Sequence, residues 1–525
     1  MKKYIDPKNR NQLLLLLLIC SSSFIVYGQQ ALTYKPPVFA DNNRLQKIQT
    51  TYRLVDSLFK TYAEKNHYPG MAFGLVIDGS LVHSGAFGYT DIVKKTLATA
   101  TSLFRIASMT KSFVAMAILK LRDEGKLQLD EPAYKYIPEM KGVKYLTTDA
   151  SPITIRNLLT HAAGFPEDNP WGDRQLQNTD DELMAQVKKG ISFSNVNGVA
   201  YEYSNLGFTL LGHIVTKVSG KPFDEYITEN ILRPLGMANT KWEYTQVPGT
   251  LLAHGYRWLN EQWVEQPMLH HGSYGAMGGL ITSIEDFSKY VALHQNAWPP
   301  ANDKDNGPIK RSSLREMHQP WNVSGLNPHN KFPTGRECAT MSAYCYGLGW
   351  MKDCENKVYV GHSGGLPGFG SQWRFLPEYG IGIISFANLT YANAGAINLQ
   401  VLDTIITLAH LQPRQLPPSY ILQQKSKVLA SLLPNWDNAE ASQLFAGNFF
   451  MDYQLDALRK EATAIFSDAG KILKVNDVVP QNQLRGSFII ETEKKNIEVS
   501  FTLTPENPPL IQEYHIQGVQ KTGKQ

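Results

Sequence analysis

Cysteine and charge are both scarce in this chain of 525 residues. There are four cysteines, and Asp, Glu, Lys and Arg together make up 19% of the sequence. The first 28 residues carry a net charge of +3, and in the rest 47 basic residues face 46 acidic ones. Nothing in this balance indicates a nucleic-acid surface. The 43% hydrophobic content is ordinary for a globular protein. A length of 525 residues allows a large core and predicts two domains.

The front of the chain lacks an apolar run long enough to span a membrane with confidence. A basic start leads into the run from Leu13 to Cys20, which serines then interrupt. This pattern is typical of a secretory signal, with cleavage expected before Gln29. We therefore expect residues 1–28 to be removed and the protein to be exported, periplasmic or secreted, with no stable membrane span. Lipidation of Cys20 is the weaker alternative, because Ile19 is larger than the residue that normally precedes a lipidated cysteine.

A metal site is also lacking. No His, Asp and Glu residues stand at ligand spacing, so the sequence predicts no metal and no cofactor, and His161 is interpreted as a structural residue. Cys338, Cys345 and Cys354 remain after cleavage of the signal. Their closeness predicts a local disulfide, but an odd number leaves the pairing open.

What the sequence does contain begins with Ser108-x-x-Lys111, followed by a helical pattern as far as Gly125. If Ser108 opens this helix, both side chains lie on one face, about 5 Å apart along the axis. A serine hydroxyl needs a base to become a nucleophile, and a desolvated amine one turn away can be that base. The motif alone is a weak signal, because a serine N-cap beside an exposed lysine has the same spacing.

A second stretch, Tyr203-Ser204-Asn205, directly precedes a helical pattern that runs to Ser219. A tyrosine there can relay the proton of Ser108 if nearby cations lower its pKa from about 10. Asn205 can donate a hydrogen bond to a substrate carbonyl. A surface aromatic residue next to a helix cap is an equally good interpretation of this tripeptide alone.

The third stretch runs from Val358 to Gly365 and contains His362-Ser363-Gly364. Alternating apolar residues predict a strand, and its glycines allow a ligand to approach the backbone. The N–H groups of Gly365 and Ser108 can pair as an oxyanion hole, and His362 would point into the same cleft. A plain strand end is the alternative.

The remaining pattern predicts helices and strands around these motifs. We expect a helix over 45–65, a hairpin turning at Asp78-Gly79, and strands over 371–377 and 380–388. Helices are expected over 153–164, 206–219, 283–294, 313–318, 397–411 and 419–433. Residues 296–345 look like a long polar surface excursion. From residue 444 onward, short alternating strands predict a small β domain, including strands over 445–449 and 463–466.

The three motifs occur in the order that resembles the serine β-lactamase and penicillin-binding-protein superfamily. The Tyr-x-Asn form is similar to class C β-lactamases, D-alanyl-D-alanine carboxypeptidases and related esterases. The resemblance implies an α/β (α+β) sandwich: an antiparallel five-stranded sheet with helices on both faces and an all-helical lobe. The resemblance covers roughly residues 50 to 411. Together with the break at Pro413, Pro417 and Pro418, it leads us to expect a hydrolase domain at 29–412, a linker with a short helix at 413–440, and a barrel-like β domain at 441–525.

The resemblance also implies roles for individual residues. Ser108 would be acylated and Lys111 would activate it, while Tyr203 would act as general base and acid. The residues implied in substrate binding and the oxyanion hole are Asn205, His362, Gly364 and Gly365. His362 stands where many members carry lysine, and a histidine is only partly charged near neutral pH.

We therefore expect an exported serine hydrolase that acts through an acyl-enzyme on an ester or amide carbonyl. D-residue peptides, cell-wall fragments and small esters are the expected substrates, and the oligomeric state is open. A β-lactamase or penicillin-binding protein proper is one alternative, and a non-catalytic binding protein that retains the fold is another.

Overall fold

The computed structural model describes residues 34–521, which divide into two compact units. One unit comprises residues 41–413, and the other combines residues 34–40 with residues 414–521. The expected signal peptide, its cleavage point and Cys20 lie outside the described residues. Within the described residues, no helix combines the length and the apolar character needed to cross a membrane.

The larger unit is built on an antiparallel sheet, in which nine strands of the described chain follow the order β3-β2-β1-β13-β12-β11-β10-β9-β8. The expected five strands form its central run, β2-β1-β13-β12-β11, and four further strands extend it at both edges. The bounds are β1 Gly70–Ile77, β2 Ser80–Asp91, β3 Thr96–Leu97, β8 Asn322–Asn327, β9 Thr340–Tyr344, β10 Gly349–Asp353, β11 Val358–Leu366, β12 Phe369–Leu376 and β13 Ile381–Ala387.

The expected hairpin is confirmed at the turn between β1 and β2. Asp78 and Gly79 both have positive φ values, 48° and 79°, as the tight turn of a twisted hairpin requires. Ile77 then pairs with Ser80, and β1 continues into pairing with β13 on its other edge. Strands from opposite ends of this unit therefore meet at the centre of the sheet.

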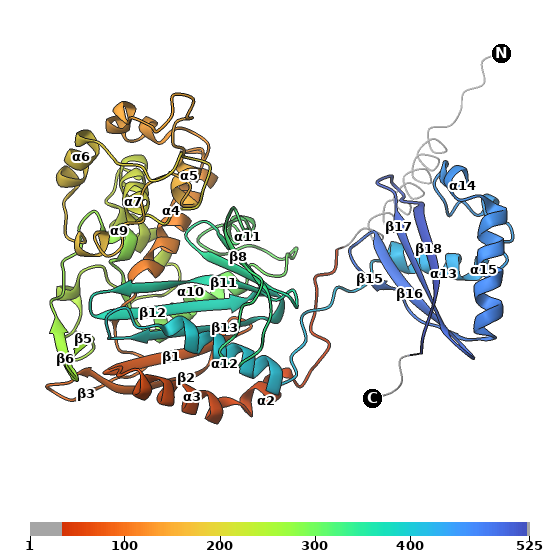
Figure 1. The fold of residues 1–525 in the computed structure, drawn as a ribbon, viewed down its shortest axis with the longest axis horizontal. Helices are drawn as coiled ribbons and strands as arrows, with labels where there is room; N and C mark the ends of the chain where they lie inside the picture. The colour runs from red at the N-terminus through yellow and green to blue at the C-terminus, as the bar shows by residue number, and fades with distance from the viewer. Residues whose placement is uncertain (1–33, 522–525) are drawn as a thin grey trace, which may run out of the picture. The chain divides into compact units, whose positions relative to one another are not determined.

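Side chains of β1 alternate between two hydrophobic cores, one on each face of the sheet. Ala72 and Val76 join the core shared with the helical lobe, whereas Phe73 and Leu75 join the core beneath the terminal helices. Helix α10 (Ile284–Gln295) covers the first face, and α3 (Tyr52–Lys65) and α12 (Ala394–Leu408) cover the second (Figure 1). All residues of β1 are buried, as expected of a strand covered on both faces.

The helical lobe surrounds α4 (Lys111–Asp123) and α7 (Asn205–Ser219), which pack against each other (Figure 1). The remaining helices of this unit are α2 Arg44–Gln49, α5 Ile155–Leu159, α6 Asp180–Lys189, α8 Phe223–Ile227, α9 Gly275–Gly278 and α11 Arg311–Met317. Two small sheets complete it, β4 Phe104–Arg105 with β7 Ile281–Thr282, and β5 Gly255–Leu259 with β6 Gln262–Gln266. The expected lobe and sandwich are therefore both present.

The helix expected over 313–318 within the excursion 296–345 is confirmed as α11, but the same segment also supplies the edge strands β8 and β9, which the sequence did not predict. Nearly all of β8 is exposed, so it carries none of the apolar alternation that marks a half-buried strand. A disulfide joins Cys338 and Cys354, and Cys345 is buried and free. The pairing that the sequence left open is therefore resolved.

The smaller unit contains a β-sheet as expected, but it is an open sheet with helices. The sheet has the order β14-β16-β17-β18, with β15 paired to β16, so β14 and β18 end it rather than closing a barrel. The expected strands over 445–449 and 463–466 are wrong, since residue 449 begins helix α14 and residues 463–466 lie within helix α15. The bounds are α13 Tyr420–Leu432, α14 Phe449–Asp452, α15 Leu455–Ala469, β14 Ile472–Val475, β15 Val479–Pro480, β16 Arg485–Thr492, β17 Asn496–Leu503 and β18 Ile511–Val519.

Candidate active site

Ser108 lies in a short 3-10 turn, Ala107–Thr110, immediately before helix α4. The preceding Ala107 has φ +50°, a left-handed conformation that is costly for a residue with a Cβ. Two hydrogen bonds fix the approach to this turn: Ile106 N–H donates to Leu280 O at 3.0 Å, and Ser371 Oγ donates to Ile106 O at 2.7 Å. The strained turn is thus held from both sides, and Ser108 is 8% exposed.

Lys111 directs its amine at Ser108. The distance from Nζ to Ser108 Oγ is 3.0 Å, and Nζ also lies 2.7 Å from Asn205 Oδ1 and 3.0 Å from Met277 O. The last two partners can only accept hydrogen bonds, so they take both N–H groups of a neutral amine. The remaining lone pair then faces the Ser108 hydroxyl, which can donate to it.

The side chain of Lys111 is completely buried, and this burial lowers its pKa to about 7. The negative charges of Asp173 and Asp168 act in the opposite direction and prevent a larger shift. A substantial share of this amine is therefore neutral at physiological pH, which is the state required of a base.

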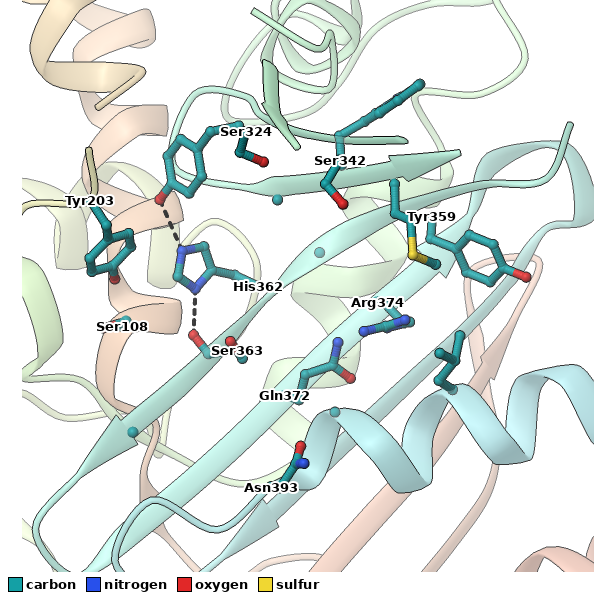
Figure 2. A pocket seen from close by; sticks show the side chains of 18 of the residues that line it. Ser108, Tyr203, Ser324, Ser342, Tyr359, His362, Ser363, Gln372, Arg374 and Asn393 are labelled. Carbon is teal, nitrogen blue, oxygen red and sulfur yellow. Dashed lines mark hydrogen bonds between the residues drawn. The ribbon is translucent and has the colours of Figure 1, made fainter. Parts of the chain in front are cut away.

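Tyr203 is held next to Ser108 by the start of helix α7. Ser204 caps that helix by accepting from Gly207 N–H at 3.3 Å, and its own N–H donates to His161 Nδ1 at 3.1 Å. Lys111 Nζ lies 4.9 Å from the centroid of the Tyr203 ring, so the amine faces the aromatic face. The hydroxyl of Tyr203 points towards Ser108 (Figure 2). Its interaction with Ser108 acts to lower the pKa of the phenol.

The protonation state of Tyr203 differs from the expected one. Burial raises the pKa of its phenol well above 10, and the hydrogen bond to Ser108 offsets only part of this shift. Tyr203 is therefore a neutral phenol that can pass on a proton, and the group poised to accept one is Lys111. The sequence led us to expect that nearby cations would lower the pKa of Tyr203, but no cation counters the effect of burial.

Asn205 is fully buried and serves the lysine rather than the open cleft. Its Oδ1 accepts from Lys111, and its Nδ2 donates to Asn169 Oδ1 at 2.6 Å. The backbone N–H of Asn205 donates to Asp168 Oδ1 at 2.6 Å, and Asp168 Oδ2 accepts from Leu206 N–H at 2.9 Å. Asp168 thus caps helix α7 and fixes the amide that orients Lys111.

His362 is 8% exposed and lies between two fixed partners. Its Nδ1 faces the carbonyl oxygen of Ser363, an acceptor, so Nδ1 carries the proton and Nε2 accepts from Tyr344 OH at 2.9 Å. Burial, assisted by the charge of Lys111, lowers the pKa of His362 to about 3. The imidazole is therefore neutral at pH 7, not partly charged as the sequence led us to expect.

Gly364 allows strand β11 to reach the nucleophile. A Cβ added to Gly364 would lie 2.2 Å from Ile106 O and 3.0 Å from the Cβ of Ala107. Strand β10 pairs with β11 only from Val358 to Gly361. The later residues of β11 therefore have a free edge on that side, and this edge borders the cleft. This edge brings Gly365 beside the turn of Ser108.

A cleft of about 920 Å³ joins these groups. Ser108, Tyr203, His362 and Ser363 surround one part of it, and Gln372, Arg374 and Asn393 lie farther along it (Figure 2). Sequence reasoning missed four residues of this region: Asp168, Asp173, Tyr344 and Tyr391. Each is a single polar residue outside any motif, so no spacing marks it. Over residues 34–521, no group of His, Cys, Asp and Glu side chains could hold a metal ion.

The comparison with known families matches residues 55–404 to the family described as Beta-lactamase, well over half of the chain. The chain belongs to the Beta-lactamase family. The superfamily resemblance of its three motifs is therefore confirmed, and membership supports serine hydrolase activity in general.

Two curated relatives of this Beta-lactamase family member come from very different organisms. Protein flp of Staphylococcus aureus (strain MW2) is 28% identical over 341 residues, which cover 64% of this chain and 62% of that protein. The chain thus spans less than two thirds of the length of such relatives. Beta-lactamase-like protein 2 of Dictyostelium discoideum is 24% identical over 529 residues, covering 95% of this chain and 91% of that protein.

Solved structures share the fold of this Beta-lactamase family member. The octameric penicillin-binding protein homologue from Pyrococcus abyssi has a TM-score of 0.56 at 23% identity, covering 88% of this chain and 98% of that one. A class C beta-lactamase has a TM-score of 0.53 at 22% identity, covering 70% and 99%. At these identities, the similarity establishes the expected fold class and no substrate.

Proposed function

We propose that this protein is an exported serine hydrolase that forms an acyl-enzyme with ester or amide substrates. The observation that carries the proposal is the 3.0 Å contact between Lys111 Nζ and Ser108 Oγ, with both other N–H positions of the amine occupied by acceptors. This arrangement leaves one lone pair free for one proton, that of the nucleophile.

The proposed reaction begins when Ser108 Oγ attacks the carbonyl carbon and its proton passes to Lys111 Nζ. The negative charge moves to the carbonyl oxygen, which the N–H groups of Ser108 and Gly365 stabilise. The tetrahedral species then expels the leaving alcohol or amine, which takes the hydroxyl proton of Tyr203. The protonated amine of Lys111 returns a proton to Tyr203, so both groups regain their starting states. Water repeats the sequence on the acyl-enzyme and releases the acid, returning Ser108 to its starting state.

His362 favours a peptidase or esterase over a β-lactamase or penicillin-binding protein proper. A neutral imidazole held between Tyr344 and the backbone of Ser363 supplies no fixed positive charge for a substrate carboxylate. D-residue peptides, cell-wall fragments and small esters remain the proposed substrates. A non-catalytic binding role is disfavoured, because burying Lys111 beside a serine has no evident benefit for binding alone.

Export to the periplasm or medium rests on the front of the sequence and on the disulfide between Cys338 and Cys354, which an oxidising compartment permits. We further propose that the hydrolase domain expected over 29–412 corresponds to residues 41–413, and that the β domain expected over 441–525 belongs to an accessory domain that begins at residue 414. The segment expected as a linker, 413–440, is part of that smaller unit, since Leu422, Leu429 and Trp436 are buried in its core. The proposed partner is a small-molecule or peptide substrate, with neither nucleic acid nor cofactor involved.

Active-site labelling tests the proposal directly. A fluorophosphonate or penicillin probe should label the purified protein covalently, and Ser108→Ala should abolish that labelling while far-UV circular dichroism stays unchanged. Ser363→Ala is a matched control, since Ser363 lines the same cleft without contacting Lys111. A substrate panel of penicillins, D-Ala-D-Ala peptides, D-aminoacyl amides and short-chain esters then ranks the substrate classes. Undiminished labelling of Ser108→Ala would refute the assignment.

A further inference from the structure

Asp173 is a carboxylate that the proposed reaction does not use. It lies in the turn Gly172–Arg174, lines the same cleft as Ser108, and is 1% exposed. Its Oδ2 accepts from Tyr391 OH at 2.9 Å, whereas its Oδ1 is buried and finds no partner among the described residues. A buried carboxylate oxygen without a donor is unfavourable unless a ligand supplies one.

Lys111 is not that donor. Its amine has three hydrogen-bond partners, Ser108, Asn205 and Met277, and among the described residues no ion pair within 4.0 Å joins Lys111 to Asp173. The two charges influence each other only at longer range. Because Asp173 lines the cleft and its Oδ1 has no donor among the described residues, a cation that enters the cleft can supply one.

The neighbours of Asp173 hold the carboxylate in position. Its turn packs closely on Asn205, since a Cβ added to Gly172 would lie 3.0 Å from the Asn205 side chain. On the other side, Tyr391 has φ +52° and its N–H donates to Phe369 O at 3.1 Å, which fixes the residue that binds Asp173. A carboxylate clamped from two segments is pre-organised for recognition.

Tyr391 places the carboxylate of Asp173 near the position proposed for the carbonyl of the substrate. A Cβ added to Gly365 would lie 2.8 Å from Cδ1 of Tyr391, so the tyrosine ring rests on Gly365. Gly365 is the residue whose N–H we assign to the carbonyl oxygen of the substrate. The Asp173–Tyr391 pair therefore lies beside the position that we assign to the carbonyl of the substrate.

We propose that Asp173, held by Tyr391, binds a protonated amino group on the acyl part of the substrate. This inference rests on the proposed hydrolase function and narrows its substrates to aminoacyl amides and esters with a free α-amine. An ammonium group supplies the donor that Oδ1 lacks, and its positive charge pairs with the buried carboxylate. An N-acylated substrate offers neither the charge nor the same donors.

The test compares alanyl p-nitroanilide with its N-acetyl form, using both D and L enantiomers and the purified full-length protein. The measured quantity is the ratio of kcat/KM for the free amine over that for the acetylated substrate. For at least one enantiomer the ratio should favour the free amine, and Asp173→Asn should lower it at least tenfold. Loss of a charge near Lys111 changes both rates alike, so it cancels in this ratio.

Glu167→Gln is the matched control, because Glu167 also lines the cleft but is exposed to solvent. This variant removes the same charge and should leave the ratio within about twofold. Tyr391→Phe is a second variant that spares the carboxylate and removes its donor. It should lower the ratio by a smaller factor, and it keeps the test decisive if Asp173→Asn does not fold.

The possible outcomes separate this inference from the function on which it rests. A wild-type ratio at or below one, or equal shifts in Asp173→Asn and Glu167→Gln, would overturn the role of Asp173. Turnover of p-nitrophenyl acetate that depends on Ser108 would in that case leave the hydrolase proposal standing. If neither anilides nor p-nitrophenyl acetate react, both proposals fall.

Discussion

Gly364 and Ile106 are in close backbone contact, and this contact joins strand β11 to the turn that carries Ser108. A Cβ placed on Gly364 would lie 2.2 Å from the carbonyl oxygen of Ile106 and 2.5 Å from Ser371 Oγ. The carbonyl is backbone, and it already accepts from Ser371. The oxyanion hole that we propose therefore depends on the absence of a side chain at this position.

Gly364→Ala should separate β11 from the Ser108 turn. We expect kcat/KM for p-nitrophenyl acetate to fall at least 100-fold, with a loss of about 1–3 kcal/mol in the free energy of unfolding from overpacking. Enzyme kinetics and urea denaturation measure the two effects. Gly249→Ala is the control, because a Cβ there meets nothing within 4 Å. Normal activity of Gly364→Ala would contradict the close approach.

The pKa of Lys111 predicts the pH dependence of the reaction. The base is the neutral amine, and burial lowers its pKa to about 7, so kcat/KM should rise about tenfold per pH unit below 7 and level off above it. Tyr203 stays protonated and His362 stays neutral across this range. Rates with p-nitrophenyl acetate between pH 5.5 and 9 measure the profile.

Replacement of the base should abolish that rise. Lys111→Met keeps much of the buried volume but has no lone pair of comparable basicity, and kcat/KM should fall by about 10²–10⁴. Lys120→Met serves as the control, because Lys120 lies on the same helix and its amine donates to Pro308 O rather than to the site. A flat wild-type profile from pH 5.5 to 8 would exclude Lys111 as the proton acceptor.

Regular spacing explains which parts of the site were predictable. Ser108 and Lys111 stand one helical turn apart, and the glycines after His362 indicate a strand that a ligand can approach. Both motifs could therefore be predicted from the local sequence. Asp173 and Tyr391 are 218 positions apart and meet only through the fold. No local pattern predicts such a contact. The charge states of Tyr203 and His362 were also inaccessible, because they depend on burial by distant segments.

The errors in the fold follow from weak or mixed patterns. Strand β8 is an exposed edge, and its polar residues look like a loop until β9 pairs with it. In the smaller unit, residues 463–466 include β-branched and aromatic side chains that favour a strand. The buried positions Leu458, Ala462, Phe466 and Ala469, however, follow the helical period, and packing of that face decided the structure.

The disulfide should stabilise the hairpin formed by β9 and β10, which lies between its two cysteines. Cys338 and Cys354 close a loop with a sequence separation of 16, for which the chain-entropy model gives about 3 kcal/mol. The double variant Cys338→Ala/Cys354→Ala should unfold at a lower urea concentration than wild type. A reductant should lower the wild-type midpoint and leave the double variant unchanged. Equal sensitivity of both proteins to the reductant would show that this bond is not the source of the stability.

His362→Lys should change both the substrate preference and the pH profile. His362 is neutral at pH 7, so lysine adds a positive charge to the cleft and should favour esters that bear a carboxylate over neutral ones, by about tenfold. The charge of Lys111 already acts on position 362, so a second cation there should lower the pKa of Lys111. The rise of kcat/KM should therefore shift to a pH below 7.

His362→Asn separates the two effects, because it alters the contact with Tyr344 without adding charge. The asparagine variant should keep the wild-type midpoint and the wild-type ratio of charged to neutral esters, whatever its absolute rate. If both variants show the same ratio as wild type, position 362 does not face the substrate. If the ratio changes in His362→Lys but the midpoint stays near 7, the cation reaches the substrate from a place too far from Lys111 to act on its proton.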